Sequence, residues 1–161
     1  MLFILIPSGE MHITTVSGKR SRKDFLATAR LIYKDDKNWI CPLDQDIENI
    51  FDPKKNPFHQ HGKCIRWVLQ DDNGNNIGRI AAFINDKKAY QYEQPTGGIG
   101  FFECINNQEA AFLLFDTAKS WLQENGMKAM DGPINFGEND SFWGLLVEGF
   151  TPPSYGMNYH H

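Results

Sequence analysis

The sequence lacks several features that would assign it to a familiar class of protein. Its three cysteines, Cys41, Cys64 and Cys104, are odd in number and contain no Cys-x-x-Cys pair, so neither a disulfide framework nor a zinc site is indicated. No apolar run approaches the ~20 residues of a membrane-spanning helix. The opening MLFILI also lacks the basic flank of a signal peptide. These absences favour a protein of the reducing cytoplasm.

An excess of positive charge is also missing. The net charge of −4 at pH 7 provides no broad attraction for nucleic acid or an anionic membrane, so neither is expected as a partner. The basic residues between positions 19 and 23 are interpreted as a solvated approach to a helix, with an anion contact as the alternative. His59 and His61 have no evident third ligand, so no metal site is predicted.

The length of the chain is sufficient for one ordinary domain. With 161 residues, the chain can bury a core without cross-links. Its 41% of hydrophobic and 22% of charged residues are typical of a soluble globular protein. We therefore predict a single domain over residues 1–161.

The first half of the sequence predicts one strand, two helices and a hairpin. Residues 12–16 alternate like a short strand, and Ser21 is expected to cap a helix that runs to Tyr33. A second, short helix is expected over residues 44–51. Asn73-Gly74 supplies the positive φ angles of a tight turn, which predicts a hairpin between residues 64–69 and 77–84.

The second half predicts a strand–helix–strand unit. A strand over residues 98–105 leads into a helix at 106–125, with Asn106 as N-cap and Glu109 at the capping-box position. Gly126 is the expected terminator, and a strand over 127–134 follows. Apolar residues recur on one face of the helix: Ala111, Leu114, Phe115, Ala118, Trp121 and Leu122. Adjacent antiparallel strands followed by one β-α-β crossover predict an α+β protein, with a mixed, mainly antiparallel sheet flanked by helices.

The most informative segment is GPINFGENDSFWG, residues 132–144. It mixes turn-forming residues with large aromatics, whereas a plain connection needs only a few residues. We predict that it caps the open end of the sheet, beside the strand that holds Glu103, and that a short helical piece follows at 142–148. Turn-holding Asx side chains and a core tryptophan are the alternative interpretation. The candidate substrate-binding residues are Asn135, Asn139, Asp140 and Trp143.

Four blocks resemble the GNAT superfamily of N-acetyltransferases: DPKKNPF (52–58), GRIAAFIN (78–85), GFFE (100–103), and GPINFGEND with GLLVEGFTPP (132–153). In particular, they resemble the N-terminal part of a family of larger, mostly uncharacterised bacterial GNAT-like proteins. The resemblance implies the acyl-CoA N-acyltransferase fold. Members of that family continue beyond the point that matches position 161, which implies a missing C-terminal element. An exposed sheet edge would then favour a homodimer.

The resemblance also implies where acetyl-CoA or another acyl-CoA would bind. In GNAT proteins, backbone N–H groups between the fourth strand and the next helix cradle the pyrophosphate. The matching cofactor-binding candidates are Cys104, Ile105, Asn106 and Asn107. This junction contains no glycine, and Glu103 and Glu109 add negative charge, each costing on the order of 3 kcal/mol at ~5 Å and an effective dielectric of ~20. We therefore predict that acetyl-CoA binds weakly or not at all.

The resemblance implies a catalytic role for Glu103, because several GNAT enzymes take their general base from the fourth strand. Such a carboxylate would deprotonate the attacking amine. The alternative is a structural carboxylate, held by the helix N-terminus or paired with Arg79. Two functions stay open: an N-acyltransferase with a degenerate coenzyme A pyrophosphate site, or a non-catalytic GNAT-like module for ligand binding or assembly.

Overall fold

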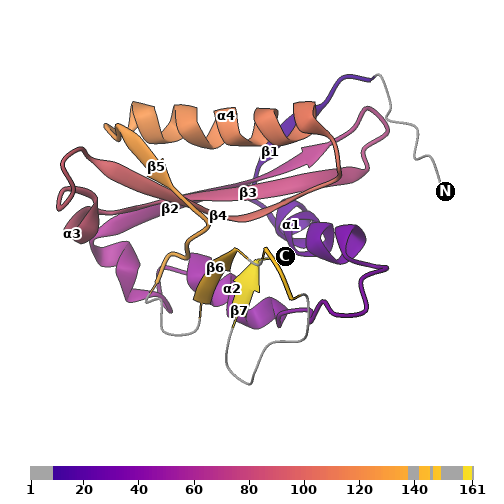
Figure 1. The fold of residues 1–161 in the computed structure, drawn as a ribbon, viewed down its shortest axis with the longest axis horizontal. Helices are drawn as coiled ribbons and strands as arrows, with labels where there is room; N and C mark the ends of the chain where they lie inside the picture. Colours follow the sequence, from indigo (N-terminus) through magenta and orange to yellow (C-terminus); the bar gives the residue numbers. More distant parts are fainter. Residues whose placement is uncertain (1–8, 138–141, 146, 150–157, 161) are drawn as a thin grey trace.

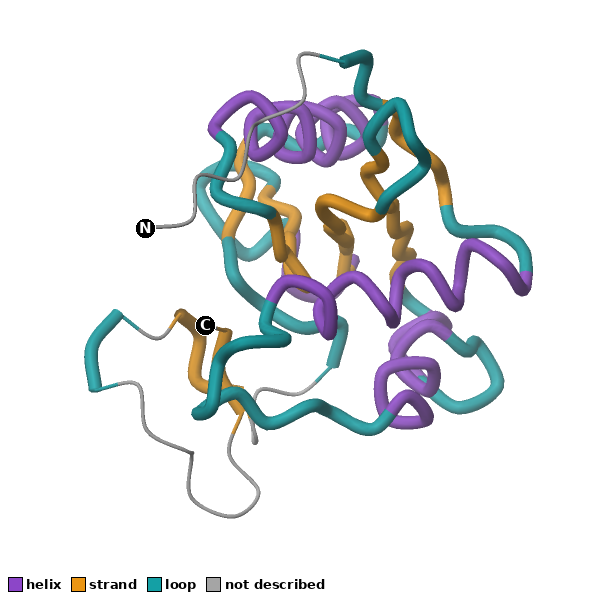
Figure 2. Tube along the Cα trace, turned by 90° about the vertical axis from the view of Figure 1, so that its right-hand side faces the viewer, coloured by secondary structure: helices purple, strands orange, loops and turns teal. Residues whose placement is uncertain are grey.

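A computed structural model describes residues 9–137, 142–145, 147–149 and 158–160 of the chain. A central sheet is flanked by helices on both faces (Figure 1), and Figure 2 shows the same layers from the side. None of the helices in these ranges is long and apolar enough to cross a membrane. The elements are β1 (His12–Thr15), α1 (Lys19–Ile32), α2 (Asp44–Phe51), η1 (Pro57–Gln60), β2 (Gly62–Gln70), β3 (Asn76–Asn85), α3 (Asp86–Ala89), β4 (Thr96–Cys104), α4 (Gln108–Glu124), β5 (Ala129–Asp131), β6 (Phe142–Leu145) and β7 (Asn158–His160).

The sheet has the strand order β1-β2-β3-β4-β5. The first four strands pair antiparallel, and β5 pairs parallel to β4 after the α4 crossover. The hairpin between β2 and β3 turns at Gly74, whose φ is 79° as the Asn-Gly pair predicts. The α+β class and the mixed, mainly antiparallel sheet are therefore confirmed.

Helix α4 packs on one face of the sheet through the predicted stripe. Leu114 and Ala118 are fully buried there, together with Ile80 of β3. The N-terminal boundary was predicted one residue too early. The N-cap is Asn107, whose Oδ1 accepts the N–H of Ala110 at 3.0 Å. Asn106 is therefore not the cap, and the third helical position is an alanine, which cannot complete a capping box.

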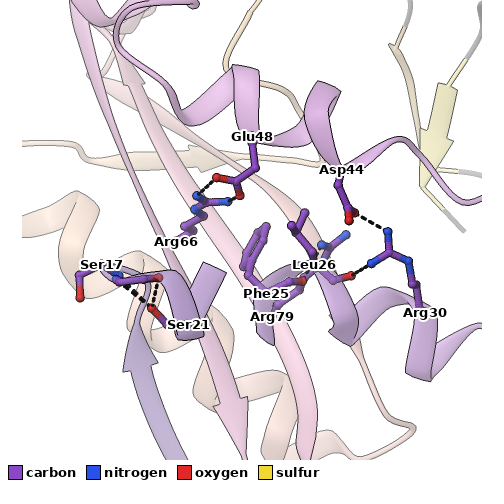
Figure 3. Close-up of polar contacts among 10 residues, drawn as sticks. Ser17, Ser21, Phe25, Leu26, Arg30, Asp44, Glu48, Arg66 and Arg79 are labelled. Carbon is purple, nitrogen blue, oxygen red and sulfur yellow. Dashed lines mark hydrogen bonds and ion pairs between the residues drawn. The ribbon is translucent and has the colours of Figure 1, made fainter. Parts of the chain in front are cut away.

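Helices α1 and α2 cover the opposite face, where Phe25 is fully buried. The cap of α1 also differs from the prediction, because Gly18 is the N-cap and Ser21 lies inside the first turn. The Ser21 hydroxyl accepts the N–H groups of Ser17 and Gly18, both at 3.1 Å (Figure 3). The serine thus satisfies amides that precede the helix instead of those in its first turn.

The helical piece predicted over residues 142–148 is wrong. Residues Phe142–Leu145 form strand β6, which pairs parallel to β7 in a separate two-stranded sheet. This small sheet lies on the same side of the main sheet as α1 and α2 (Figures 1 and 2). Aromatic residues favour strands, and the partner strand is distant in sequence, so local periodicity could not reveal the pairing.

Candidate functional site

A β-bulge interrupts strand β4 in the middle of the sheet. Arg79 lies opposite Glu103 and Ala81 lies opposite Gly100, so Phe101 and Phe102 together face a single residue of β3. Phe101 has a φ of 51°, in the left-handed region that non-glycine residues rarely adopt. Bulges and residues held at such angles are frequent beside active sites, because they redirect backbone groups out of the ladder.

Among the described residues, no strand pairs with the outer edge of β4 next to this bulge. Strand β5 pairs with β4 only over Thr96, Gly97 and Gly98, and the N–H of Ile134 then donates to the carbonyl of Ile99 at 2.8 Å. Beyond that point no residue in the described ranges pairs with this edge. The N–H of Ile105 donates inward to the carbonyl of Ile77, so alternation along the strand directs the Cys104 N–H to the outer edge.

A buried ion pair and a partly buried one lie on the α1/α2 face of the sheet. Arg79 Nε donates to Glu103 Oε2 at 2.6 Å, and its Nη1 donates to the carbonyl of Phe25 at 2.8 Å. Arg66 makes a bidentate pair with Glu48 at 2.6 and 3.1 Å, which Figure 3 shows beside Phe25 and Arg79. Both guanidinium groups also lie near the ring of Phe25, at 4.6 Å for Arg79 and 5.0 Å for Arg66. These contacts tie α1 and α2 to the centre of the sheet.

The structure places Glu103 in the pair with Arg79, which is one of the alternatives that its sequence position left open. The side chain is only 7% exposed, and its partner Arg79 also bonds the carbonyl of Phe25 in α1. Glu103 therefore lies on the α1 side of the sheet and not beside the first turn of α4. Its charge also acts on Tyr33, whose phenol pKa is raised first by burial and then by Glu103, while Arg79 opposes the shift. Arg79 balances the negative charge of the Glu103 carboxylate. The expectation that this carboxylate repels the pyrophosphate of coenzyme A is therefore wrong.

The four cofactor-binding candidates lie together where β4 leads into α4. Cys104 is half-buried, and burial raises the pKa of its thiol to about 11. The Asn107 side chain is used to cap α4, while Asn106 is exposed. The first amides of a helix have no intrahelical acceptor, so this end of α4 can donate to an anion. Glu109 is exposed in the first turn and retains its opposing charge.

Asn135 is the one substrate-binding candidate whose side chain the structure describes, and it lies away from this junction. Asn135 lines a pocket beside Gly98 at the start of β4, and roughly 20 Å of strand separates Gly98 from Cys104. Asn139 and Asp140 lie outside the described residues. Trp143 belongs to β6, and its side chain is likewise outside the description. Binding by these residues stays a prediction.

Residues 132–137 lie against β4, as the sequence predicts for the beginning of the aromatic segment. Ile134 packs so closely over Gly98 and Gly100 that neither position has room for a Cβ atom. Phe136 is 1% exposed and stacks on Phe83 of β3, with ring centroids 5.6 Å apart and planes 5° apart. This part of the segment therefore fills the α1/α2 face near the first half of β4, whereas the bulge is in the second half.

Sequence analysis missed the role of Arg66 and the bulge itself. Arg66 lies between apolar residues of β2, with Ile65 before it and Trp67 after it, and a buried arginine needs an acidic partner, which was the available signal. The bulge has no such signal, because Phe101 gives no local reason for a positive φ. No group of three His, Cys, Asp or Glu side chains in the described part of the chain could hold a metal ion.

Two known bacterial proteins are similar to this chain over most of its length. No family model matches the chain. The chain is 33% identical over 148 residues to protein YghO of Escherichia coli, covering 92% of this chain and 37% of that protein. It is also 33% identical over 158 residues to the bacterial ceramide synthase of Caulobacter vibrioides, covering 94% of this chain and 40% of that protein. The chain thus spans about two fifths of the length of these relatives.

Solved structures show which fold this is. A predicted acetyltransferase of Clostridium acetobutylicum, in complex with acetyl-CoA, aligns with a TM-score of 0.56 and 12% identity over 78% of this chain and 82% of that chain. A tandem GNAT protein from the clavulanic acid biosynthesis pathway aligns with a TM-score of 0.56 and 13% identity over 73% of this chain and 34% of that chain. The chain therefore has the GNAT fold.

Proposed function

We propose that this chain is the thioester-binding unit of an N-acyltransferase. The observation that carries the proposal is the bulge at Phe101 and Phe102, in the part of β4 beyond Ile99, along which no described strand pairs on the outer side. The bulge interrupts the ladder with β3, and in this proposal an extended acyl thioester lies along the outer side of β4 beside Phe102 and Cys104.

Backbone N–H groups supply the first chemical element of the proposal. A thioester carbonyl becomes an oxyanion when an amine adds to its carbon, and backbone donors at that oxygen stabilise the developing charge. The intermediate then collapses to the amide as the C–S bond breaks, and the departing thiolate takes up a proton and leaves as the free thiol. We assign two donors to this oxygen, the backbone N–H of Phe102 and the backbone N–H of Cys104, which alternation directs to the outer side of β4. The Cys104 thiol does not act as a nucleophile here, because its pKa of about 11 keeps it protonated at neutral pH.

Glu103 supplies the acid–base element, as the resemblance implies. The attacking nitrogen must lose a proton, and a carboxylate on β4 can accept it directly or through a water molecule. The ion pair with Arg79 holds the carboxyl group in one place beneath the bulge. We assign Glu103 to proton transfer through water, because its side chain is buried under α1 whereas the proposed thioester lies along the strand edge.

The relatives support the class of acceptor. One relative is named a bacterial ceramide synthase, and a ceramide is the N-acyl derivative of a long-chain amino alcohol. Acetyltransferases with the same fold also transfer an acyl group from a thioester. We therefore propose a long-chain amino alcohol as the acceptor and a long-chain acyl thioester as the donor, in a longer protein of which this chain spans a part.

The test combines binding and product formation. A non-hydrolysable thioether analogue of a long-chain acyl-CoA is titrated into the isotope-labelled chain. We expect the amide resonances of Phe102 and Cys104 to shift, while that of Thr14 in β1 stays unchanged. The chain and its Glu103→Gln variant are then incubated with acyl-CoA and a sphingoid base, and the N-acyl product is measured by mass spectrometry. Product from the parent chain and much less from the variant supports the proposal, whereas ligand shifts confined to other strands would contradict it.

The non-catalytic module remains the second candidate, favoured by the absence of glycine between Cys104 and Asn107. A close backbone approach to a pyrophosphate is easier at glycine. Thioester binding at the bulge without any N-acyl product from the chain or from the longer protein would select this second function. The homodimer and the cytoplasmic location predicted from the sequence stay predictions, which light scattering and cell fractionation would test.

A further inference from the structure

The pocket that Asn135 lines is away from the bulge, between α3, the start of β4 and residues 134–137. Its volume is about 140 Å³, comparable to the ~150 Å³ cavity that holds one benzene molecule in another protein. Its apolar and aromatic lining residues include Phe58, Tyr92 and Ile134, together with Phe83 and Phe136, which are themselves almost fully buried. The pocket therefore admits a ligand of a few non-hydrogen atoms, and a long-chain amine or a nucleotide is too large for it.

Two asparagines are among the lining residues of this pocket. Asn85 Oδ1 accepts the N–H of Lys87 at 3.1 Å, and Asn135 Oδ1 accepts the N–H of Phe136 at 2.8 Å. Because each oxygen is already bonded to a backbone donor, the orientation of both amides is set. Each asparagine therefore presents an NH2 group, a donor that suits a carboxylate oxygen.

Charges of opposite sign complete the lining. Lys88 and Asp131 both border the pocket, and neither belongs to the ion pairs found among the described residues. The Lys88 ammonium on its flexible stem joins the two asparagine amides as a third donor. Asp131 offers carboxylate oxygens, which accept from an ammonium group.

We propose that this pocket binds a small zwitterion of the amino acid type. Its carboxylate is bound by Lys88 and the amides of Asn85 and Asn135, its ammonium group is bound by Asp131, and a short side chain packs on the apolar part of the lining. This site is separate from the proposed thioester site. Phe83 connects the two regions, since its ring contacts Phe136 on one side and lies 6.3 Å from the ring of Phe101 in the bulge.

The experiment uses L-alanine, L-serine and glycine as probes of the intact chain, with binding followed by calorimetry and by the side-chain NH2 resonances of Asn85 and Asn135. We expect an amino acid to bind and to shift both resonances. Acetate and methylammonium, which each carry one of the two charges, are expected to bind at least about tenfold more weakly, since each loses a charge-assisted hydrogen bond. Phosphoethanolamine tests whether a phosphate can replace the carboxylate.

Matched variants separate the site from general surface charge. Asp131→Asn and Lys88→Gln are each expected to weaken alanine binding by about tenfold or more. The neighbouring Lys87→Gln and the α4 variant Asp116→Asn remove the same charges outside the pocket and should leave binding unchanged. Equal affinity for acetate and alanine, equal loss in the control variants, or no binding of any zwitterion would overturn the proposal. None of these outcomes depends on thioester binding at Phe102 and Cys104, so the two proposals fail independently.

Discussion

Arg79 donates to Glu103 across 2.6 Å at the point where β3 and β4 leave register. The two side chains are 2% and 7% exposed, and Arg79 also bonds the carbonyl of Phe25 in α1. A buried ion pair contributes little net stability over an apolar pair of the same size, but each partner depends on the other for its charge to be tolerated. The pair therefore fixes the position of the bulge relative to α1.

Removing one partner of this pair should destabilise the protein strongly. Glu103→Ala leaves the Arg79 guanidinium buried without its carboxylate, and we expect a loss of about 3–5 kcal/mol in the free energy of unfolding. The double variant Arg79→Met with Glu103→Ala should be less destabilised than the sum of the single changes. Urea denaturation measures all three, and Glu109→Ala on the exposed first turn of α4 is the control. Additive effects of the two single changes would contradict the coupling.

The positive φ of Phe101 predicts an unusual order of stability between glycine and alanine. Both Phe101→Ala and Phe101→Gly lose the ring, but only glycine adopts a φ of 51° without strain. We expect Phe101→Gly to be more stable than Phe101→Ala by about 1 kcal/mol. At the neighbouring Phe102, the order should be reversed by about 0.5–1 kcal/mol, because glycine weakens an ordinary strand position. The same order at both positions in thermal unfolding would show that the bulge is misplaced.

The α4 face predicts a large difference between two positions of the same helix. Leu114 is fully buried against the sheet, so Leu114→Ala should cost about 2–5 kcal/mol. Phe112 is 56% exposed, and Phe112→Ala should change stability by about 0.5 kcal/mol. Chemical denaturation of both variants tests the helix phase. Similar losses at the two positions would mean that α4 packs through another face.

Cysteine labelling should depend on pH in a residue-specific way. Burial raises the pKa of Cys64 and Cys104 to about 11, so both are thiols at neutral pH, and Cys41 is exposed. The thiolate is the reactive form. We expect iodoacetamide to modify Cys41 first at pH 8, while the rates at Cys64 and Cys104 continue to rise through pH 10. Peptide mass spectrometry measures the three rates, and fast labelling of Cys104 at pH 7 would contradict its burial.

The repulsion at the coenzyme A junction should now arise from Glu109 alone. Its exposed carboxylate lies in the first turn of α4, whereas Glu103 is neutralised by Arg79. Glu109→Gln is therefore expected to tighten weak acetyl-CoA binding a few-fold at low salt, and this gain should shrink as salt screens the charge. Glu103→Gln should bring no such gain. Calorimetry of both variants distinguishes the carboxylates, and tight binding of acetyl-CoA by the parent chain would show that neither of them repels the ligand.

Elements with local signals could be predicted from the amino-acid sequence. The Asn73-Gly74 turn, the apolar stripe of α4 and the left-handed Gly126 each follow from the preferences of a few adjacent residues, and all three are present in the structure. The order of these elements was enough to predict an α+β fold, because chain connectivity allows few arrangements. The resemblance of four short blocks to GNAT proteins indicated the same fold.

The residues that come together at the site could be identified only from the tertiary structure. The pairing of Arg79 with Glu103 joins residues 24 positions apart, and the bulge exists because β3 and β4 pair in a particular register. The same holds for β6, which pairs with a strand distant in sequence. It also holds for Asn135, which long-range packing places near the start of β4 and far from Cys104. Such contacts depend on the packing of whole layers, and no residue carries a local preference for them.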